Sequence, residues 1–345
     1  MSAITTHRPH VSAPGVQIVR RVTIVALLSV AIVTLLLAVP GLRGVAEEIS
    51  HMDAGWVIAA VALELGSCAA FVVVFRLFFD ELPPGAACEL AWTEQGAGAL
   101  LPGGGVGAMA VGGWLLRRAG ISRRQVIERS SALFFLTSTV NVAALVGAGA
   151  LLTLGVLAGP HNLLLSGVPM LGGFVATGAV LFVPVLMRRM PGRRQKGWLV
   201  DLVDGIDGAR RSLVRPSWRL IGALGYLGLD IAALGATFAA SGHPLPLAPL
   251  VLGYLIGYLA NLIPIPGGFG VLEGGLAGAL IAYGAPPAQA AAAVIVYHVI
   301  AFWIPSLGGL LGYALLSRRL TTTDATVSTE RRHTQPTRLT PEPAY

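Results

Sequence analysis

The sequence predicts an all-α polytopic membrane protein with about six spanning helices and two re-entrant, broken-helix segments in an inverted-topology repeat. Three observations predict this class. Hydrophobic residues make up 54% of the chain and charged residues only 12%, whereas soluble proteins carry about 25% charged residues. Several apolar runs are long enough to cross a bilayer. A Pro-Gly motif also occurs once in each half, inside a long apolar segment.

The elements follow in order along the chain. Residues 1–19 and 319–345 are polar and are expected to be disordered cytoplasmic tails, so the single transmembrane domain is 20–318. The apolar run 22–39 is interpreted as an uncleaved first span, because no small-residue cleavage site follows it. A short interfacial helix is expected near 45–52. The further predicted spans are 56–79, 131–157, 163–187, 218–240 and 288–316, and the broken segments are 89–116 and 247–283.

The Pro-Gly motif repeats at a fixed distance. LPGGGVG occupies 101–107 and IPGGFG occupies 265–270, 164 residues later. The same spacing, without a gap, also matches Gly120 with Gly284 and Gln125 with Gln289. Self-similarity at one spacing indicates a duplicated unit, with repeat halves of approximately 56–157 and 218–316.

Arginine clusters predict the orientation of the chain. Loops 117–129 and 188–215 are basic, as are the Arg20-Arg21 and Arg318-Arg319 pairs, and such clusters face the cytoplasm. If both broken segments crossed the membrane fully, loop 117–129 would face outward with its five arginines. Re-entrant segments remove this conflict. The first then enters from the cytoplasm and the second from outside, the repeat is inverted as alternating access requires, and both termini are cytoplasmic.

The broken segments are the candidate site. Non-helical backbone at membrane depth is tolerated where it is buried in protein or lines a wet cavity. Helices that begin after the breaks would direct their N-termini, which suit an anion such as a lipid phosphate, toward mid-membrane. The alternative is that the breaks are packing kinks without a role in binding. The occurrence of two breaks in matching register makes this alternative less favoured. The candidate substrate-binding residues are Pro102, Gly103, Gly104, Gly105, Gly107, Pro264, Pro266, Gly267, Gly268, Gly270, Glu273, Tyr297 and His298.

Several buried polar residues each allow two interpretations. Glu273 is either a helix cap or a site for a proton or a headgroup amine. His298 is either an interhelical hydrogen bonder or a titrating group, and a pairing of these two residues is a hypothesis. Glu64 and Asp230 are either structural or handle a coupling ion or proton. Glu94 is expected nearer the cytoplasmic interface.

Other functions lack support in the sequence. No enzyme signature is present, and the glycine run at 103–105 follows no soluble strand, so a nucleotide loop is not indicated. The two cysteines, Cys68 and Cys88, have no spacing typical of a disulfide framework or a metal site. No cofactor or metal is therefore expected. The net charge of +7 comes from clustered arginines and is interpreted as topology rather than nucleic-acid binding.

Two sets of motifs carry a resemblance to a known family. LIPIPGGFGVLE at 262–273, with Gly284, Tyr297-His298 and FWIP at 302–305, resembles the second signature of the lysylphosphatidylglycerol synthase transmembrane family. LLPG at 100–103 and RRAGIS at 117–122 resemble its first signature. The resemblance covers roughly residues 20–318. The chain departs from it at Ala108, where the family usually has Glu, and at His298, where it often has Arg.

The resemblance implies a lipid flippase-like protein of the bacterial inner membrane. Only 29 residues follow Leu316, so a stand-alone member without the aminoacyl-transfer domain is expected. The expected partners are membrane lipids with an anionic or lipid-linked headgroup, with a lipid-modifying enzyme or a homodimer as further options. A secondary transporter for a small solute and a non-transporting accessory subunit of a lipid-modifying enzyme remain alternatives.

Overall fold

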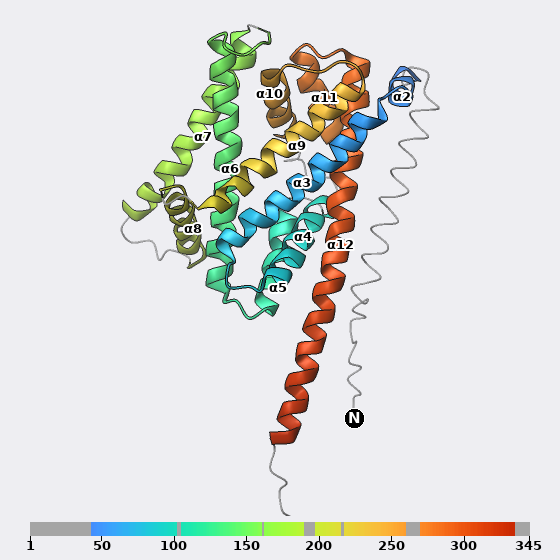
Figure 1. The fold of residues 1–345 in the computed structure, drawn as a ribbon. Coiled ribbons are helices and arrows are strands. Elements are labelled where there is room, and N and C mark those ends of the chain that lie inside the picture. Colours follow the sequence, from blue (N-terminus) through green and yellow to red (C-terminus); the bar gives the residue numbers. More distant parts are fainter. Residues whose placement is uncertain are drawn as a thin grey trace, which may run out of the picture.

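The computed structural model describes residues 43–101, 105–160, 162–189, 197–214, 217–259 and 270–334. All regular structure in these ranges is helical (Figure 1), which confirms the all-α class. The predicted first span, 22–39, lies outside the described residues. The helices are α2 (Arg43–Ser50), α3 (Ala54–Phe78), α4 (Pro84–Leu100), α5 (Gly105–Arg118), α6 (Arg123–Thr153), α7 (Leu163–Arg189), α8 (Gly197–Val214), the 3-10 turn η2 (Trp218–Leu220), α9 (Ile221–Ala240), α10 (Leu247–Gly257), α11 (Val271–Ala282) and α12 (Pro287–Thr334).

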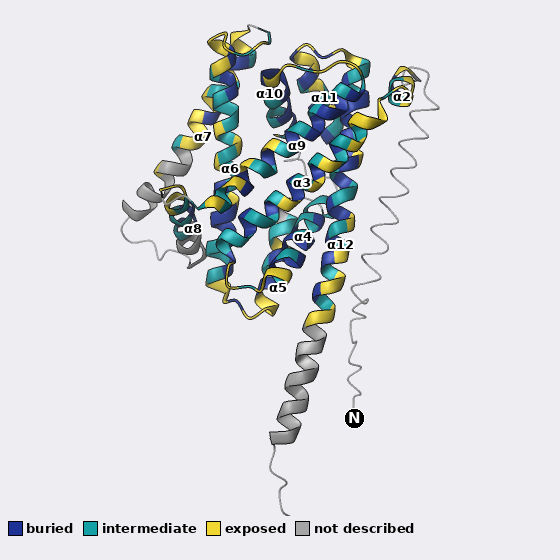
Figure 2. Cartoon of the chain, viewed as in Figure 1, coloured by how far each residue is buried: buried dark blue, intermediate teal, exposed yellow. Residues whose placement is uncertain are grey.

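Four helical stretches are long and apolar enough to cross a membrane. They are Ala54–Phe78, Arg123–Thr153, Trp218–Ala240 and Pro287–Arg319. The part of α7 whose side chains are described adds a shorter apolar stretch, Leu163–Gly178. Phe174, Val175 and Phe182 on α7 are more than half exposed, and Figure 2 shows exposed residues along the outer surfaces of the helices. An apolar exterior of this kind is typical of a membrane-embedded surface.

The helices extend further than the sequence predicted. The segment 117–129 is not a basic loop, because α5 continues to Arg118, α6 begins at Arg123 and only 119–122 connect them. The second basic loop, 188–215, contains the helix α8. Helix α12 continues to Thr334, past the boundary predicted for a disordered tail. The arginines of the first segment lie within α5 and α6, so a cluster of charge does not mark the end of a helix.

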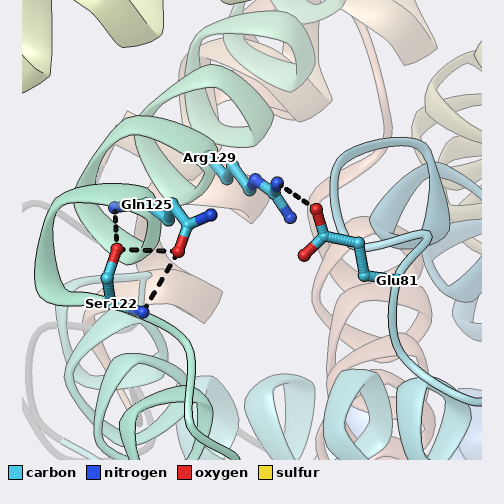
Figure 3. A network of polar contacts seen from close by, with 4 residues as sticks. All are labelled: Glu81, Ser122, Gln125 and Arg129. Carbon is cyan, nitrogen blue, oxygen red and sulfur yellow. Dashed lines mark hydrogen bonds and ion pairs between the residues drawn. The ribbon is translucent and has the colours of Figure 1, made fainter.

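A capping box explains why α6 starts early. The Gln125 N–H donates to Ser122 Oγ (3.3 Å), and the Ser122 N–H donates to Gln125 Oε1 (3.2 Å), which satisfies two N–H groups at the helix start. Farther along the helix, Arg129 donates to Glu81 in the α3–α4 connection (2.7 Å), as Figure 3 shows. This hydrogen bond and the positive charge lower the pKa of Glu81. The start of α6 is thereby tied to the end of α3.

Helices α3 and α9 cross in close contact at the centre of the molecule (Figure 1). They run antiparallel, since the Asp53 N–H donates to the Ala240 carbonyl near one end and Arg219 Nη1 donates to the Arg76 carbonyl near the other. Gly222 lies against the backbone of α3: a Cβ there would be 2.6 Å from the Ala70 carbonyl oxygen. A small residue at such a crossing allows two backbones to approach.

Each broken segment folds back on itself as a helical hairpin. A Cβ at Gly112 on α5 would lie 2.5 Å from a Glu94 carboxylate oxygen on α4, and a Cβ at Gly257 on α10 would lie 2.5 Å from Leu276 Cα on α11. These pairs are centred on positions 103 and 266–267, so the chain reverses direction within each broken segment. Helices α5, α10 and α11 have 14, 11 and 12 residues, fewer than the roughly 17 that a spanning helix needs.

The two hairpins lie at opposite ends of the molecule. In Figure 1, α4 and α5 occupy the lower half of the view, and α10 and α11 occupy the upper half. Each hairpin packs in its own hydrophobic core: one core is built mainly on α3, α4, α5 and α6, and the other on α9, α10, α11 and α12. The order of elements in the two cores is therefore the same, as a duplicated unit requires.

The turn after each hairpin repeats in atomic detail. Gly120 has φ 88° and Gly284 has φ 99°, a left-handed conformation that glycine adopts without steric cost. The Ile121 N–H donates to the Leu116 carbonyl, and the Ala285 N–H donates to the Leu280 carbonyl, which is the Schellman pattern that ends a helix. Both bonds obey the 164-residue spacing. The two turns of the predicted repeat thus have the same backbone conformation.

Candidate functional site

A cavity of about 310 Å³ lies between the two hairpins. Its walls include residues beside both breaks: Leu101 and Gly105 flank the first, and Tyr258 and Leu272 are close to the second. The remaining wall comes from α3, α4, α5, α6, α9 and α12, with Ala108 and Met109 contributed by α5. Elements from both halves of the repeat therefore enclose one space, and the helix starts at Gly105 and Val271 lie next to or close to it.

Two of the predicted acidic residues meet at this cavity. Glu64 on α3 and Asp230 on α9 are 5% and 9% exposed, and both line the wall. The antiparallel crossing of α3 and α9 brings their carboxyl groups into electrostatic contact. Glu64 also accepts from the Cys68 thiol (3.8 Å). Each acid lies in an otherwise apolar helix, so the pairing depends on the crossing and not on local sequence.

Two tyrosine hydroxyls donate hydrogen bonds to the Asp230 carboxylate. Tyr254 on α10 donates to Asp230 Oδ2 (2.5 Å), and Tyr297 on α12 donates to Oδ1 (2.6 Å). The two tyrosine rings pack edge to face at 6.3 Å. Three helices of the second half thus converge on one carboxyl group, and a carboxylate that accepts two such bonds is well stabilised in its charged form.

Glu273 caps the start of its helix and also contacts His298. One of its carboxylate oxygens accepts from the Gly270 N–H at the start of α11 (2.6 Å), and the other lies 2.7 Å from His298 Nδ1 on α12. The structure therefore brings the hypothesised Glu273–His298 pair together. His298 is 5% exposed and lines the cavity, so this contact links the second hairpin to the cavity wall.

Glu94 is a cavity residue that sequence reasoning did not include in the site. It is 7% exposed and lines the cavity. The absent side chain of Gly112 leaves room for its carboxylate between α4 and α5. Glu94 precedes the break by two turns. Helix α5 packs back along α4 and covers the Glu94 side chain, which its position in the sequence did not indicate.

The other predicted residues divide into three groups. Gly105 and Tyr297 line the cavity, whereas Gly107 is half-buried on α5 and Gly270 is exposed at the start of α11. Sequence reasoning missed Tyr226 and Tyr258, which also line the cavity. For Tyr258 a signal was available, because Tyr254 lies one helical turn before it. The predicted residues that lie outside the described ranges are Pro102, Gly103, Gly104, Pro264, Pro266, Gly267 and Gly268.

The charge of the cavity wall is one-sided. Three carboxyl groups line it, those of Glu64, Glu94 and Asp230, together with the imidazole of His298. Among the residues described, no lysine or arginine lines this cavity, and no cluster of three or more metal-ligating side chains is found. The wall therefore offers acceptors for hydrogen-bond donors and for positive charge.

Comparisons with known proteins identify the fold family. The family model of the lysylphosphatidylglycerol synthase TM region matches residues 26–309. A UPF0104 membrane protein of Methanothermobacter thermautotrophicus is 33% identical over 100 residues, which is 29% of this chain and 28% of that protein. The chain thus matches little more than a quarter of that relative's length. The match of the family model over most of the chain shows that this membrane protein belongs to the lysylphosphatidylglycerol synthase TM region family.

Proposed function

We propose that this protein moves a lipid headgroup between the two leaflets of a membrane. The observation that carries the proposal is the cavity of about 310 Å³ between two oppositely placed hairpins. Discontinuous helices in matching positions of two halves are the usual substrate site of alternating-access transporters. Membership of the lysylphosphatidylglycerol synthase TM region family supports a lipid substrate.

The cavity wall supports a headgroup that combines an anion with donor groups. Helices α5 and α11 start beside the breaks, and helix N-termini favour phosphate. Glu64, Glu94 and Asp230 favour amine or hydroxyl donors on the same headgroup. Phospholipids and lipid-linked sugars both offer this combination. We infer that the hairpins are re-entrant, that the arginines at both ends of the 119–122 turn face the cytoplasm, and that the protein transports without catalysing a reaction.

Transport of a small solute is the second candidate. A cavity of about 310 Å³ lies at the lower end of small-molecule sites and is too small for two acyl chains. A lipid would therefore have to keep its chains outside, between the helices, while its headgroup crosses. A solute would need no such lateral opening.

A leaflet-exchange assay distinguishes the two candidates. Purified protein is placed in proteoliposomes with headgroup-labelled phospholipids and polyprenyl-linked lipids, and the label in the outer leaflet is quenched over time. We expect exchange of one lipid class, with a large loss in Glu273→Gln and His298→Ala. Glu81→Gln, outside the cavity and exposed, is the matched control that should retain exchange.

The solute candidate has its own readout in the same vesicles. If no lipid class exchanges while trapped amino acids or sugars move, the solute transporter is the correct function. If neither lipid nor solute moves with folded protein, transport itself is rejected and an accessory subunit of a lipid-modifying enzyme remains.

A further inference from the structure

The buried Glu64 and Asp230 carboxyl groups have no obvious counter-charge. They face each other across the α3–α9 crossing, and no lysine or arginine lines the cavity among the residues described. Two ionised carboxylates in contact inside a membrane protein repel each other, and their burial separates both from water. One proton held by the pair removes this repulsion.

The hydrogen bonds indicate which group holds the proton. Both oxygens of Asp230 accept from tyrosine hydroxyls, so this carboxyl is stabilised as an anion. Glu64 accepts a long bond from the Cys68 thiol, and its buried Oε2 accepts no hydrogen bond from a donor in the described part of the chain; its remaining close contact is with the Asp230 carboxyl. Glu64 Oε2 is therefore the atom with a vacant position for a proton, next to the Asp230 anion.

We propose that Glu64 is the proton-carrying group that couples headgroup movement to a proton gradient. This inference rests on the proposed transport function and names its energy source. Glu64 releases its proton to water in the cavity and takes one up again after the access changes. The released site carries two adjacent negative charges, which attract a headgroup amine or other positive group, so proton and headgroup occupy the pair in turn.

The tyrosines provide a route from the proton to the hairpin. Tyr254 belongs to α10 in the second hairpin, and Tyr297 belongs to α12. When Glu64 is ionised, the second negative charge strengthens the hydrogen bonds from the tyrosine hydroxyls. When Glu64 is protonated, it competes with the tyrosines as a donor to Asp230. The protonation of Glu64 thus changes the contacts that hold α10 and α12 against α9.

Other titratable groups around the pair must be separated from Glu64 in any test. The α6 residues in this wall are Ser130, Leu133, Phe134 and Thr137, none of which titrates near neutral pH. Besides Tyr254 and Tyr297, the neighbours are Cys68 on α3, Tyr226 on α9, Tyr258 at the end of α10, Glu94 on α4 and His298 on α12, which contacts Glu273. His298 and Glu94 are the two that most resemble Glu64 in burial, and each needs its own variant.

Infrared difference spectroscopy tests the proton site without any substrate. Protein in phosphatidylethanolamine–phosphatidylglycerol vesicles is titrated with pH while the C=O stretch of protonated carboxyl groups is recorded. We expect a titrating band that is lost in Glu64→Gln and kept in Glu94→Gln and His298→Ala. Loss of the band in Glu94→Gln but not in Glu64→Gln overturns the assignment, and so does the absence of any titrating band in the wild type.

A gradient experiment tests the coupling. The membrane potential is clamped with potassium and valinomycin, a pH difference is imposed, and the steady-state leaflet distribution of the exchanged lipid is measured. If one proton is exchanged per headgroup, each pH unit shifts the wild-type distribution about tenfold. Glu64→Gln should show no shift, and Glu64→Asp should retain one.

The outcomes separate this inference from the proposed function. Wild-type exchange that ignores the pH gradient, or that follows a sodium gradient instead, refutes proton coupling and leaves headgroup transport standing. Failure of exchange in every lipid class refutes headgroup transport, while the infrared band still decides whether Glu64 carries a proton. If Glu64→Gln does not fold, the band and gradient response of Glu64→Asp, shifted from those of the wild type, serve in its place.

Discussion

Substitution of Gly222 by alanine should weaken the α3–α9 crossing. A Cβ at this position would lie 2.6 Å from both the Ala70 carbonyl oxygen and the Val74 amide nitrogen. Both atoms belong to the backbone of α3, so no side chain can rotate away. Because ordinary contact distances start near 3.4 Å, the two helices would have to separate by close to 1 Å.

The expected size follows from two opposing terms. Overpacking of a closely packed contact costs about 1–3 kcal/mol, whereas alanine in place of glycine in a helix gains about 0.5–1 kcal/mol. Gly228 on the same helix is the matched control, since nothing lies within 4 Å of a Cβ there. Gly228→Ala should therefore be neutral or stabilising. The free energies of unfolding of the two variants should differ by about 2 kcal/mol, roughly 30-fold in the unfolding equilibrium constant.

Reversible unfolding in mixed micelles provides the measurement. Tryptophan fluorescence is followed as the fraction of denaturing detergent increases, and the midpoints of Gly222→Ala, Gly228→Ala and the wild type are compared. If Gly222→Ala is as stable as Gly228→Ala, the close approach of α3 and α9 is incorrect. The pairing of Glu64 with Asp230, which depends on that crossing, would then lose its structural basis.

Three further predictions concern the site and its orientation. Glu273→Gln and His298→Ala should each slow exchange, and the double variant should be no slower than the worse single one, with a coupling of about 0.5–3 kcal/mol; additive losses would show that their contact is not functional. Ser122→Cys and Pro286→Cys, in a chain without native cysteines, should react with an impermeant maleimide from opposite faces of the membrane, and labelling from one face would reject the inverted repeat. Gly112→Ala should displace the Glu94 carboxylate, which lies where the new Cβ would be, and should reduce exchange while the protein stays folded. A normal exchange rate would show that the position of the Glu94 carboxylate does not matter for transport.

The hairpins were predictable because their signals are local. Proline removes a helical hydrogen-bond donor wherever it stands, and a glycine at the end of a helix permits the left-handed turn. The matched spacing of Gly120 and Gly284 therefore predicted two equivalent turns, and the structure has both. The arginines of 117–129 can face the cytoplasm only if the segment before them, 89–116, folds back, and this led to the prediction that both broken segments fold back.

The composition of the cavity wall was less accessible from sequence. Glu94 and the tyrosines Tyr226 and Tyr258 reach the cavity through tertiary packing, and the one-turn spacing of Tyr254 and Tyr258 was the local sequence signal for this wall. The convergence of Tyr254 and Tyr297 on Asp230 joins three helices that are distant in the chain. Only the crossing geometry brings such residues together, and no local sequence pattern indicates which residues a helix crossing will join.

The basic segments were misjudged for a different reason. Arginine is a good helix former, so its clustering indicates the side of the membrane and says nothing against helix. The capping box of Ser122 and Gln125 was visible in the sequence, and it was the correct sign that α6 begins at Arg123. Turn signals were better guides to the helix ends than charge.

The repeated Schellman turn has a consequence for how such a chain arose and how it inserts. The backbone of the turn at Gly120 and Gly284 is the same, but arginines flank only the first copy. A single ancestral unit with this turn and few charges would have had no fixed orientation during biogenesis. Two oppositely inserted copies would have assembled the same two-hairpin enclosure as a dimer. Fusion into one chain, with arginines acquired on one side, then makes each half's direction heritable and permits the two faces of the enclosure to diverge.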